Sequence, residues 1–300
     1  MAYTSGDTIL DNHYNDFATS VNAIWGTGST DSGYGQSNTV SAVSAGATVT
    51  ATQWTTLLAR ISSMASHQGS SITSITNPSV GDTIAAYTAL STNIGTITTN
   101  RLTVNSRASV VEVSATTTTN LTGTLVQEGK WVFASANQAR YFFNAGGRLS
   151  VRWDISGFTA NNKANEWNAL LAACGTYQIT AQASGKSGGS GTTSTNNTNY
   201  GYYDMTSSYV EVFKQFFDAS SYTAYGTNFL KLEVFQNGAE VHWKTTMEDA
   251  AADTVYNKSI YTNAENVDGT KQSFMGNEAP DTTYVTASWG TVTQTILQNG

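Results

Sequence analysis

The sequence predicts an α+β protein in which an N-terminal helical segment precedes a mainly antiparallel β-sandwich with one inserted helix. Two observations lead to this prediction. Apolar residues in the first third of the chain recur at three- and four-residue spacing, the period of an amphipathic helix. In the last third, apolar and polar residues alternate, which is the period of a strand. We therefore predict a helical anchoring or oligomerisation segment at residues 1–105 and a β-rich domain at residues 106–300.

The composition indicates a folded chain with an uncharged polar surface. Only 12% of the 300 residues are charged, yet the chain contains 7 Trp, 15 Tyr and 11 Phe. Disordered chains combine high charge with few aromatic residues, so this balance favours a folded protein. The net charge of −7 and the scattered basic residues argue against a nucleic-acid partner, which requires clustered Lys and Arg.

The sequence also argues against secretion and membrane insertion. The N-terminus lacks the basic and apolar parts of a signal peptide. No apolar run approaches the roughly 18 residues that a membrane span needs. We therefore expect a protein that is made in a cytoplasm and has no membrane partner. The single cysteine, Cys174, ends an apolar helical stretch, and we expect it to be a buried small hydrophobic residue rather than a reactive thiol.

Three helices are predicted in the N-terminal segment, each after a turn glycine and a capping Asp or Thr. The three starts resemble one another: Gly6-Asp-Thr-Ile9, Gly46-Ala-Thr-Val49 and Gly81-Asp-Thr-Ile84. In the first two helices the apolar residues share one face. Three apolar stripes form only a small core, so we expect this segment to pack on neighbouring copies as much as on itself. A small independent helical bundle is the alternative.

Residues 130–157 (KWVFASANQARYFFNAGGRLSVRWDISG) are predicted to contain a hairpin that organises the β domain. Its strands are Ala139–Phe143 and Leu149–Trp153, and Asn144–Gly147 supplies residues that adopt positive φ at low cost. Three arginines in this stretch are expected to point outward or toward a partner, and none has an acidic neighbour that suggests catalysis: Arg140, Arg148 and Arg152.

Further elements follow from alternation and from turn signals. A helix is predicted over residues 159–175, and residues 184–199 are predicted to be a flexible Gly/Ser/Thr/Asn loop. Asn237-Gly238 is the strongest hairpin signal in the chain. The predicted strands are Ser109–Val113, Tyr177–Ala181, Tyr209–Phe213, Phe229–Phe235, Ala239–Thr245, Tyr284–Ser288 and Trp289–Leu297.

Candidate catalytic and metal-binding residues are few. The three histidines, His13, His67 and His242, lie far apart and show no metal-ligand spacing; His242 is the first to mutate. The acidic group Glu248, Asp249 and Asp253 could serve glycoside hydrolysis or hold calcium. Such a run is more often a solvated loop or a helix start, and we favour that interpretation. We expect no enzyme, no catalytic residue, no metal and no cofactor.

Tyrosines near glycines are the remaining candidates for binding. Amphipathic rings in loops suit stacking on sugars or docking on a protein partner, and they equally suit packing of one protomer on another. We expect these rings to be exposed contacts for a partner or a glycan: Tyr200, Tyr202, Tyr203, Tyr222 and Tyr225.

Two stretches, GDTILDNHYNDF at 6–17 and ARYFFNAGG at 139–147, resemble virion structural proteins of tailed bacteriophages, most closely those of marine and cyanobacterial phages. The resemblance covers most of the chain. It implies a structural subunit of the virion, associated with the tail, baseplate or fibre. Such a subunit is assembled in the host bacterial cytoplasm and binds other copies of itself and other virion proteins. The family has no established catalytic residues.

Three alternatives remain beside this expectation. The first is a carbohydrate-binding adhesin whose partner is a host-surface glycan. The second is a neck or capsid-decoration protein. The third is an enzyme acting on host polysaccharide through the acidic group at 248–253.

Overall fold

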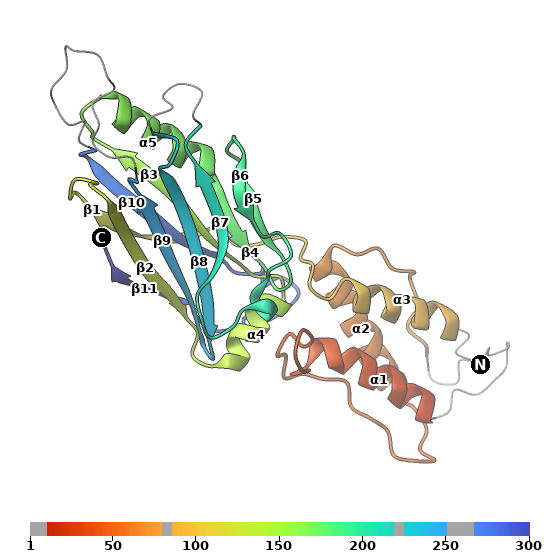
Figure 1. Ribbon diagram of the computed structural model, residues 1–300. Coiled ribbons are helices and arrows are strands. Elements are labelled where there is room, and N and C mark those ends of the chain that lie inside the picture. Colours follow the sequence, from red (N-terminus) through yellow and green to blue (C-terminus); the bar gives the residue numbers. More distant parts are fainter. Residues whose placement is uncertain (1–10, 80–85, 219–224, 251–266) are drawn as a thin grey trace, which may run out of the picture. The chain divides into compact units, whose positions relative to one another are not determined.

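The computed structural model describes residues 11–79, 86–218, 225–250 and 267–300. Within these residues, three helices come first and two antiparallel sheets follow, with further helices inserted between the strands (Figure 1). The predicted α+β class with a β-sandwich is therefore confirmed. The chain divides into two compact units, each built from separated segments. Unit 1 takes residues from 1–109, 137–147 and 279–290, and unit 2 takes residues from 110–136, 148–278 and 291–300.

Unit 1 contains the three predicted helices, α1 (Asp11–Trp25), α2 (Ala51–Gln68) and α3 (Tyr87–Thr99). Their buried residues lie on the predicted apolar faces and include Tyr14, Phe17, Trp54, Leu57 and Leu90. A capping box fixes the start of α2, because Thr50 and Gln53 exchange hydrogen bonds between side chain and backbone. The predicted starts at 6–9 and 81–84 lie outside the described residues.

Two asparagines of α1 hold an extended segment along the helix. The Asn15 side chain donates to the Val43 carbonyl and accepts from the Val43 amide, at 2.9 and 2.8 Å. Asn22 makes the same pair of bonds with Val40, both at 2.8 Å. A carboxamide carries one donor and one acceptor side, as a peptide group does. Each asparagine side chain therefore makes the two hydrogen bonds that a residue of a neighbouring strand would make.

The same two-point bond recurs twice more in unit 1. Asn93 of α3 accepts from the Thr73 amide at 2.9 Å and donates to the Thr73 carbonyl at 2.8 Å. Gln36 accepts from the Thr286 amide at 2.9 Å and donates to its carbonyl at 3.0 Å. The Gln36 bonds tie a late segment of the chain to unit 1. The predicted strand Tyr284–Ser288 is wrong, because this segment is bound by a side chain rather than by a neighbouring strand.

The predicted hairpin at residues 139–153 is wrong in its first half, because residues 136–144 form the helix α4 (Ala136–Asn144). Ala139, Phe142 and Phe143 are fully buried at helical spacing. The glycines end this helix instead of turning a hairpin, since the Gly147 amide bonds back to the Phe142 carbonyl at 2.8 Å. A side chain at Gly147 would sit 2.5 Å from the Phe142 ring, so the close approach requires glycine.

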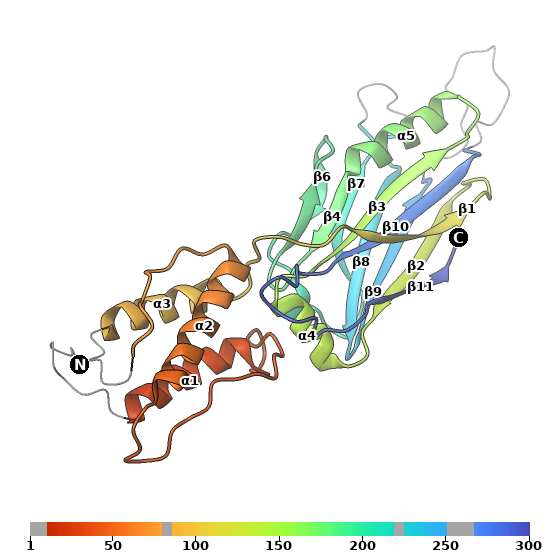
Figure 2. The same cartoon turned by 180° about the vertical axis from the view of Figure 1, so that it is seen from behind.

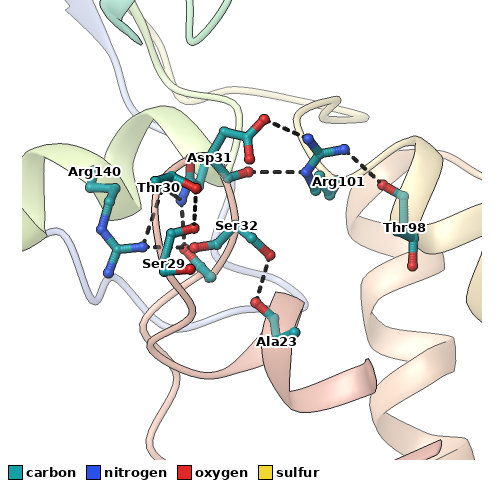
Figure 3. A network of polar contacts seen from close by, with 10 residues as sticks. Ala23, Ser29, Thr30, Asp31, Ser32, Thr98, Arg101 and Arg140 are labelled. Carbon is teal, nitrogen blue, oxygen red and sulfur yellow. Dashed lines mark hydrogen bonds and ion pairs between the residues drawn. The ribbon is translucent and has the colours of Figure 1, made fainter. Parts of the chain in front are cut away.

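Two arginines fix an exposed loop of unit 1, residues 27–33 (Figure 3). Arg140 of α4 donates to the carbonyls of Ser32 and Thr27, both at 2.7 Å. Arg101 donates to the Asp31 carbonyl at 3.1 Å and pairs with the Asp31 carboxylate at 2.5 Å. Arg140 thus binds backbone of its own unit. Its expected outward role is replaced by a structural one.

Unit 2 is the β-sandwich, with strand orders β1-β10-β3-β4-β5 and β11-β2-β9-β8-β7-β6 (Figures 1 and 2). Every pair of neighbouring strands is antiparallel. The strands are β1 (Val111–Thr117), β2 (Thr124–Val132), β3 (Arg148–Ser156), β4 (Thr176–Ile179), β5 (Ser184–Ser187), β6 (Thr193–Asn196), β7 (Val210–Phe216), β8 (Phe229–Asn237), β9 (Glu240–Glu248), β10 (Thr270–Glu278) and β11 (Thr293–Gln298).

Buried tryptophans bridge the two sheets of unit 2. The Trp153 ring stacks on Phe213 with ring centroids 5.6 Å apart, and its indole donates to the Thr245 hydroxyl at 2.9 Å. The Trp131 indole donates to the Gly276 carbonyl of the opposite sheet at 3.1 Å. Each ring buries a large apolar area while its N–H has a partner, which satisfies both requirements of a buried tryptophan.

Several predictions for unit 2 are confirmed. The Asn237-Gly238 turn joins β8 to β9, with Gly238 at φ 62°. The predicted helix is α5 (Asn162–Cys174), which begins after the cap Asn161. Cys174 is buried, and burial raises the pKa of its thiol to about 12, so it stays protonated at neutral pH.

Other predictions are corrected. The segment 184–199 is not a structureless loop, because it contributes β5 and β6. The predicted last strand begins only at Thr293. Strand β10 was not predicted at all, since its inward positions include the polar residues Lys271 and Ser273, both buried. Arg148 and Arg152 form ion pairs with carboxylates of other strands that lie far away in the sequence, Glu278 at 2.6 Å and Glu112 at 2.7 Å, respectively.

Candidate functional site

The predicted binding tyrosines do not form one exposed group. Tyr202 is 5% exposed and Tyr225 is 3% exposed, so the expectation that these two rings are exposed is wrong. Tyr200 and Tyr203 are half-buried. Tyr222 lies outside the described residues. The contact role proposed for these residues remains a prediction.

The tyrosines are also spread along unit 2. The Tyr202 hydroxyl is 3.3 Å from the Gln236 side chain, near the last residue of β8. Tyr225 lies just before the first residue of the same strand, Phe229. A strand rises about 3.3 Å per residue, so these two rings lie roughly 20 Å or more apart. A single ligand of small size cannot contact both.

The predicted histidines do not converge. His67 is buried in unit 1, where its Nε2 bonds to the Ala145 carbonyl at 2.9 Å. His13 packs against the Tyr87 ring, also in unit 1. His242 lies on β9 in unit 2. Across the part of the chain that the structure describes, no three His, Cys, Asp or Glu side chains are placed to hold a metal ion.

The acidic group near 248 is only partly a solvated run. The Glu248 carboxylate accepts from the Thr124 hydroxyl at 2.7 Å. Asp249 is instead buried and pairs with Lys163 at 2.5 Å, so the solvated-loop interpretation is wrong for this residue. Asp253 lies outside the described residues.

The hairpin β8–β9 builds an aromatic and charged surface that we call the aromatic face: Tyr209, Glu233, Phe235, His242 and Lys244. Its two-residue turn fixes the register, which places Phe235 opposite His242 and Glu233 opposite Lys244. All four point away from the core, because the alternate residues, such as Leu232, Val234 and Trp243, are fully buried.

The rings of the aromatic face form a continuous row. Phe235 and His242 stack with centroids 4.1 Å apart and planes 13° apart. Tyr209 meets Phe235 edge to face at 4.7 Å. The Lys244 ammonium lies 4.3 Å from the centroid of the Tyr209 ring. Such a row of half-buried rings offers flat apolar surface beside hydrogen-bonding groups.

Ion pairs flank these rings on both sides. Glu233 lies 3.0 Å from both Lys231 and Lys244. Burial by itself would raise the pKa of Glu233, but its bonds to the two lysines lower that pKa below its usual value. Glu240 binds Lys130 at 2.7 Å and His242 at 2.9 Å, and these bonds lower the pKa of its carboxyl. Both carboxylates are therefore charged at neutral pH and hold the lysines and His242 in place.

The second candidate surface is apolar and lies on edge strands of unit 2. Val111 is 59% exposed, and Val110 and Val113 of the same stretch are also exposed, as is Leu297 of β11. The two edge strands meet, because the Gln294 side chain donates to the Val111 carbonyl at 2.8 Å. We call these four residues the valine edge. Exposed apolar side chains on an edge strand mark a site where another chain can add.

A pocket of about 400 Å³ lies in unit 2 beside α5 and β7. Glu166 and Asp218 both line it. Burial, and secondarily the nearby Asp218 charge, raises the pKa of Glu166. Two carboxylates on one pocket are groups that general acid–base chemistry can use.

The aromatic face could have been found from the sequence. Alternation puts Phe229, Lys231, Glu233 and Phe235 on one side of the strand, and a two-residue turn aligns Glu240, His242 and Lys244 with them. A search for tyrosines near glycines does not find these residues, because it does not consider which residues of the hairpin lie opposite each other. The valine edge had no such signal, because the sequence does not show which strands are outermost.

In the described residues no helix has the length and apolarity that crossing a membrane requires. Comparison of the chain with protein-family models, with curated proteins and with solved structures finds no match.

Proposed function

We propose that this protein is a structural subunit of a tailed-phage virion that acts through protein–protein assembly, at the tail, baseplate or fibre. The observation that carries the assembly role is the valine edge. Val111 and Val113 present apolar side chains on an outermost strand, where a monomer that worked alone would place charged or covered residues. The place in the particle rests on the sequence resemblance.

We propose a second copy of this chain as the partner of the valine edge. An isologous contact would bring the same exposed valines of two copies together and bury them. Backbone groups of β1 are already bonded to side chains of the last residues, at the Val111 carbonyl (Gln294) and the Thr116 amide (Asn299), so the contact joins apolar side chains rather than extending the sheet. The low charge of the chain does not oppose such self-association.

Sedimentation of the full chain tests this contact. We expect an oligomer that dissociates at least tenfold more readily when Val111 and Val113 are both replaced by Thr, which keeps the β-branched shape and removes the apolar surface. Tyr284→Ser is the matched control, because Tyr284 is an exposed large side chain of unit 1. A monomeric wild-type chain, or equal dissociation of the double variant, would contradict the proposed contact.

The place in the virion needs a separate experiment. Electron microscopy of phage particles that carry a tagged copy of the chain should show the tag on the tail, baseplate or fibres. A tag on the neck or the capsid would favour the decoration role instead. Particles without the tag, made in cells that contain the tagged chain, would contradict the structural role altogether.

The aromatic face favours a second function, adhesion to a host-surface glycan. Sugar rings stack on flat aromatic side chains, and the Phe235–His242 pair is flanked by the charged groups of Lys244 and Glu233. We expect Phe235→Ala to reduce adsorption of the full chain to host cells at least tenfold. Tyr203→Ala, from the loop predicted at first, is the control and should leave adsorption unchanged. Reduced adsorption of Tyr203→Ala with unchanged adsorption of Phe235→Ala would instead indicate a binding site at the tyrosines.

A further inference from the structure

Lys163 is a buried lysine at a position where helix formation does not favour a positive charge. It lies in the first turn of α5, where the helix dipole disfavours a positive charge. Its side chain is only 1% exposed. Burial of an ammonium group costs several kcal/mol unless a partner compensates for the lost water. The position therefore depends on what surrounds the Lys163 Nζ atom.

One carboxylate holds this amine beside an amide. Asp249 follows β9, and its Oδ2 lies 2.5 Å from Lys163 Nζ. Its Oδ1 accepts a hydrogen bond of 2.7 Å from Asn228 Nδ2. The two oxygens of a single carboxylate thus contact both the lysine amine and the asparagine side-chain amide.

The backbone around this cluster keeps the groups in position. Asn228 is fully buried. Its backbone N–H donates to the Tyr225 carbonyl at 2.9 Å, and its backbone carbonyl accepts from the Phe217 N–H at 3.1 Å. The Asp249 amide donates to the Gly123 carbonyl at 2.9 Å. The amine, the carboxylate and the amide therefore come from three separate parts of unit 2.

Buried aromatic rings lie near the cluster. The Tyr225 ring centroid lies 6.0 Å from Lys163 Nζ. Trp167, one turn further along α5, meets Phe217 edge to face at 4.9 Å, and both are buried. A lysine amine is a nucleophile once its proton has passed to a carboxylate in contact with it.

We propose that Lys163 and Asn228 form an intramolecular isopeptide bond, with Asp249 as the proton-transferring catalytic residue. Lys163 Nζ attacks Asn228 Cγ and forms the new C–N bond. Asp249 takes one proton from Nζ and gives one proton to Nδ2, to which it is already hydrogen-bonded. The Cγ–Nδ2 bond then breaks and ammonia leaves. Atoms and charges balance, with no oxidant or cofactor.

Lys163 could form an amide bond with Asp249 or with Asn228, and the composition of the cluster favours Asn228. A bond from Lys163 to Asp249 would release water and would leave Asn228 as the third group, and an amide cannot transfer protons as a carboxyl group does. A bond from Lys163 to Asn228 leaves the carboxyl group of Asp249 in contact with both the attacking and the leaving nitrogen. The second arrangement supplies general acid–base catalysis at both atoms.

The bond would tie α5 to the turn before β8 and close a large loop of unit 2. A covalent link of this kind restricts the unfolded chain as a disulfide does, without depending on redox conditions. It is independent of the proposed virion role, since it follows from unit 2 alone.

Mass spectrometry of the full wild-type chain tests the proposal. We expect an intact mass lower than the sequence requires by one ammonia, and a branched tryptic peptide in which Lys163 is joined to Asn228 and resists cleavage. Asn237-Gly238 can also lose ammonia by cyclising, so the branched peptide is the deciding observation. An unmodified Lys163 peptide, or a loss of water with a Lys163–Asp249 link, would overturn the proposal.

Variants separate the roles of the three residues. Lys163→Arg keeps a cation beside Asp249 but removes the nucleophile, and Asp249→Asn removes the proton transfer; neither should yield the branched peptide. Lys271→Arg is the matched control, because Lys271 is equally buried but donates to backbone carbonyls, including that of Gly269 at 2.8 Å. It should keep the branched peptide. Where a variant does not fold, the wild-type peptide map alone decides.

Discussion

Unit 1 and the β8–β9 hairpin of unit 2 use polar side chains in opposite ways. In unit 1, amide side chains such as Asn15, Asn22 and Asn93 bond to the backbone where no neighbouring strand does. In the β8–β9 hairpin, the backbone groups pair in a ladder, and polar side chains such as Glu233 and Lys244 lie on the outer face. The difference teaches that a low-charge polar composition does not by itself describe a surface. Some of the polar side chains instead bond to backbone groups within the helical unit.

This contrast also bears on where binding can occur. A side chain that bonds two backbone groups is fixed in orientation and keeps only one donor and one lone pair for a ligand. The asparagines of unit 1 are therefore poor candidates for contacts. The half-buried rings of the aromatic face keep surface that a partner can cover.

The strongest test of unit 2 is the loss of an inner ring. Phe213→Ala removes the ring that stacks on Trp153 and lies 5.8 Å from Tyr177, and it leaves a cavity. We expect the free energy of unfolding to fall by about 3–5 kcal/mol in denaturant titrations. Phe235→Ala, on the outer face of the same sheet, is the size-matched control and should cost about 1 kcal/mol or less. Equal losses would contradict the assignment of inner and outer faces.

The corresponding test of unit 1 removes one amide. Asn22→Leu leaves the Val40 amide and carbonyl without their partner, and Val40 is buried. We expect a loss of about 1–3 kcal/mol in the same titration, because an unsatisfied buried backbone group costs its desolvation. Ser20→Ala on the same helix, whose hydroxyl bonds to the Asp16 carbonyl in an exposed position, should change little. A neutral Asn22→Leu would mean that the two-point bonds do not hold the segment.

A smaller effect should appear as a pH dependence of unit 1. Burial lowers the pKa of His67 below its usual value of 6.5, opposed by the hydrogen bond to Ala145 and by the Asp281 charge. Because the folded pKa is depressed, the stability from neutral His67 is complete above pH 6.5 and is lost as the pH falls through the folded pKa. Denaturant titrations of His67→Gln should lack this component. An unchanged slope against pH in the variant would contradict it.

Periodicity and turn chemistry predicted much of the fold. The apolar stripes of α1 and α2, the caps of α5 and the Asn237-Gly238 turn all follow from neighbours within a few residues. Because these signals involve residues close together in the chain, they can be recognised in a single sequence. The same local rules failed at 139–143, where alternation and helical spacing both fit and burial of Phe142 and Phe143 decided for the helix.

The candidate sites were predicted less well. His242 was singled out, and it does lie in the aromatic face, but Phe235 and Tyr209 were not connected to it. Asp249 was singled out as an acid. Its partners Lys163 and Asn228 are distant in sequence, and nothing local links them. Pairings of this kind depend on how strands and helices are arranged in space.

The α+β class, most helices and strands, and the burial of Cys174 follow from the amino-acid sequence, because each depends on the spacing of apolar residues along the chain. Which strands are outermost, and therefore that Val111 and Val113 form an exposed edge, follows from the assembled sheets alone. Only the folded chain brings the Lys163 amine, the Asp249 carboxylate and the Asn228 amide together. Such juxtapositions arise from the order of strands in a sheet, which backbone hydrogen bonds permit in many forms and which the packing of the whole unit selects.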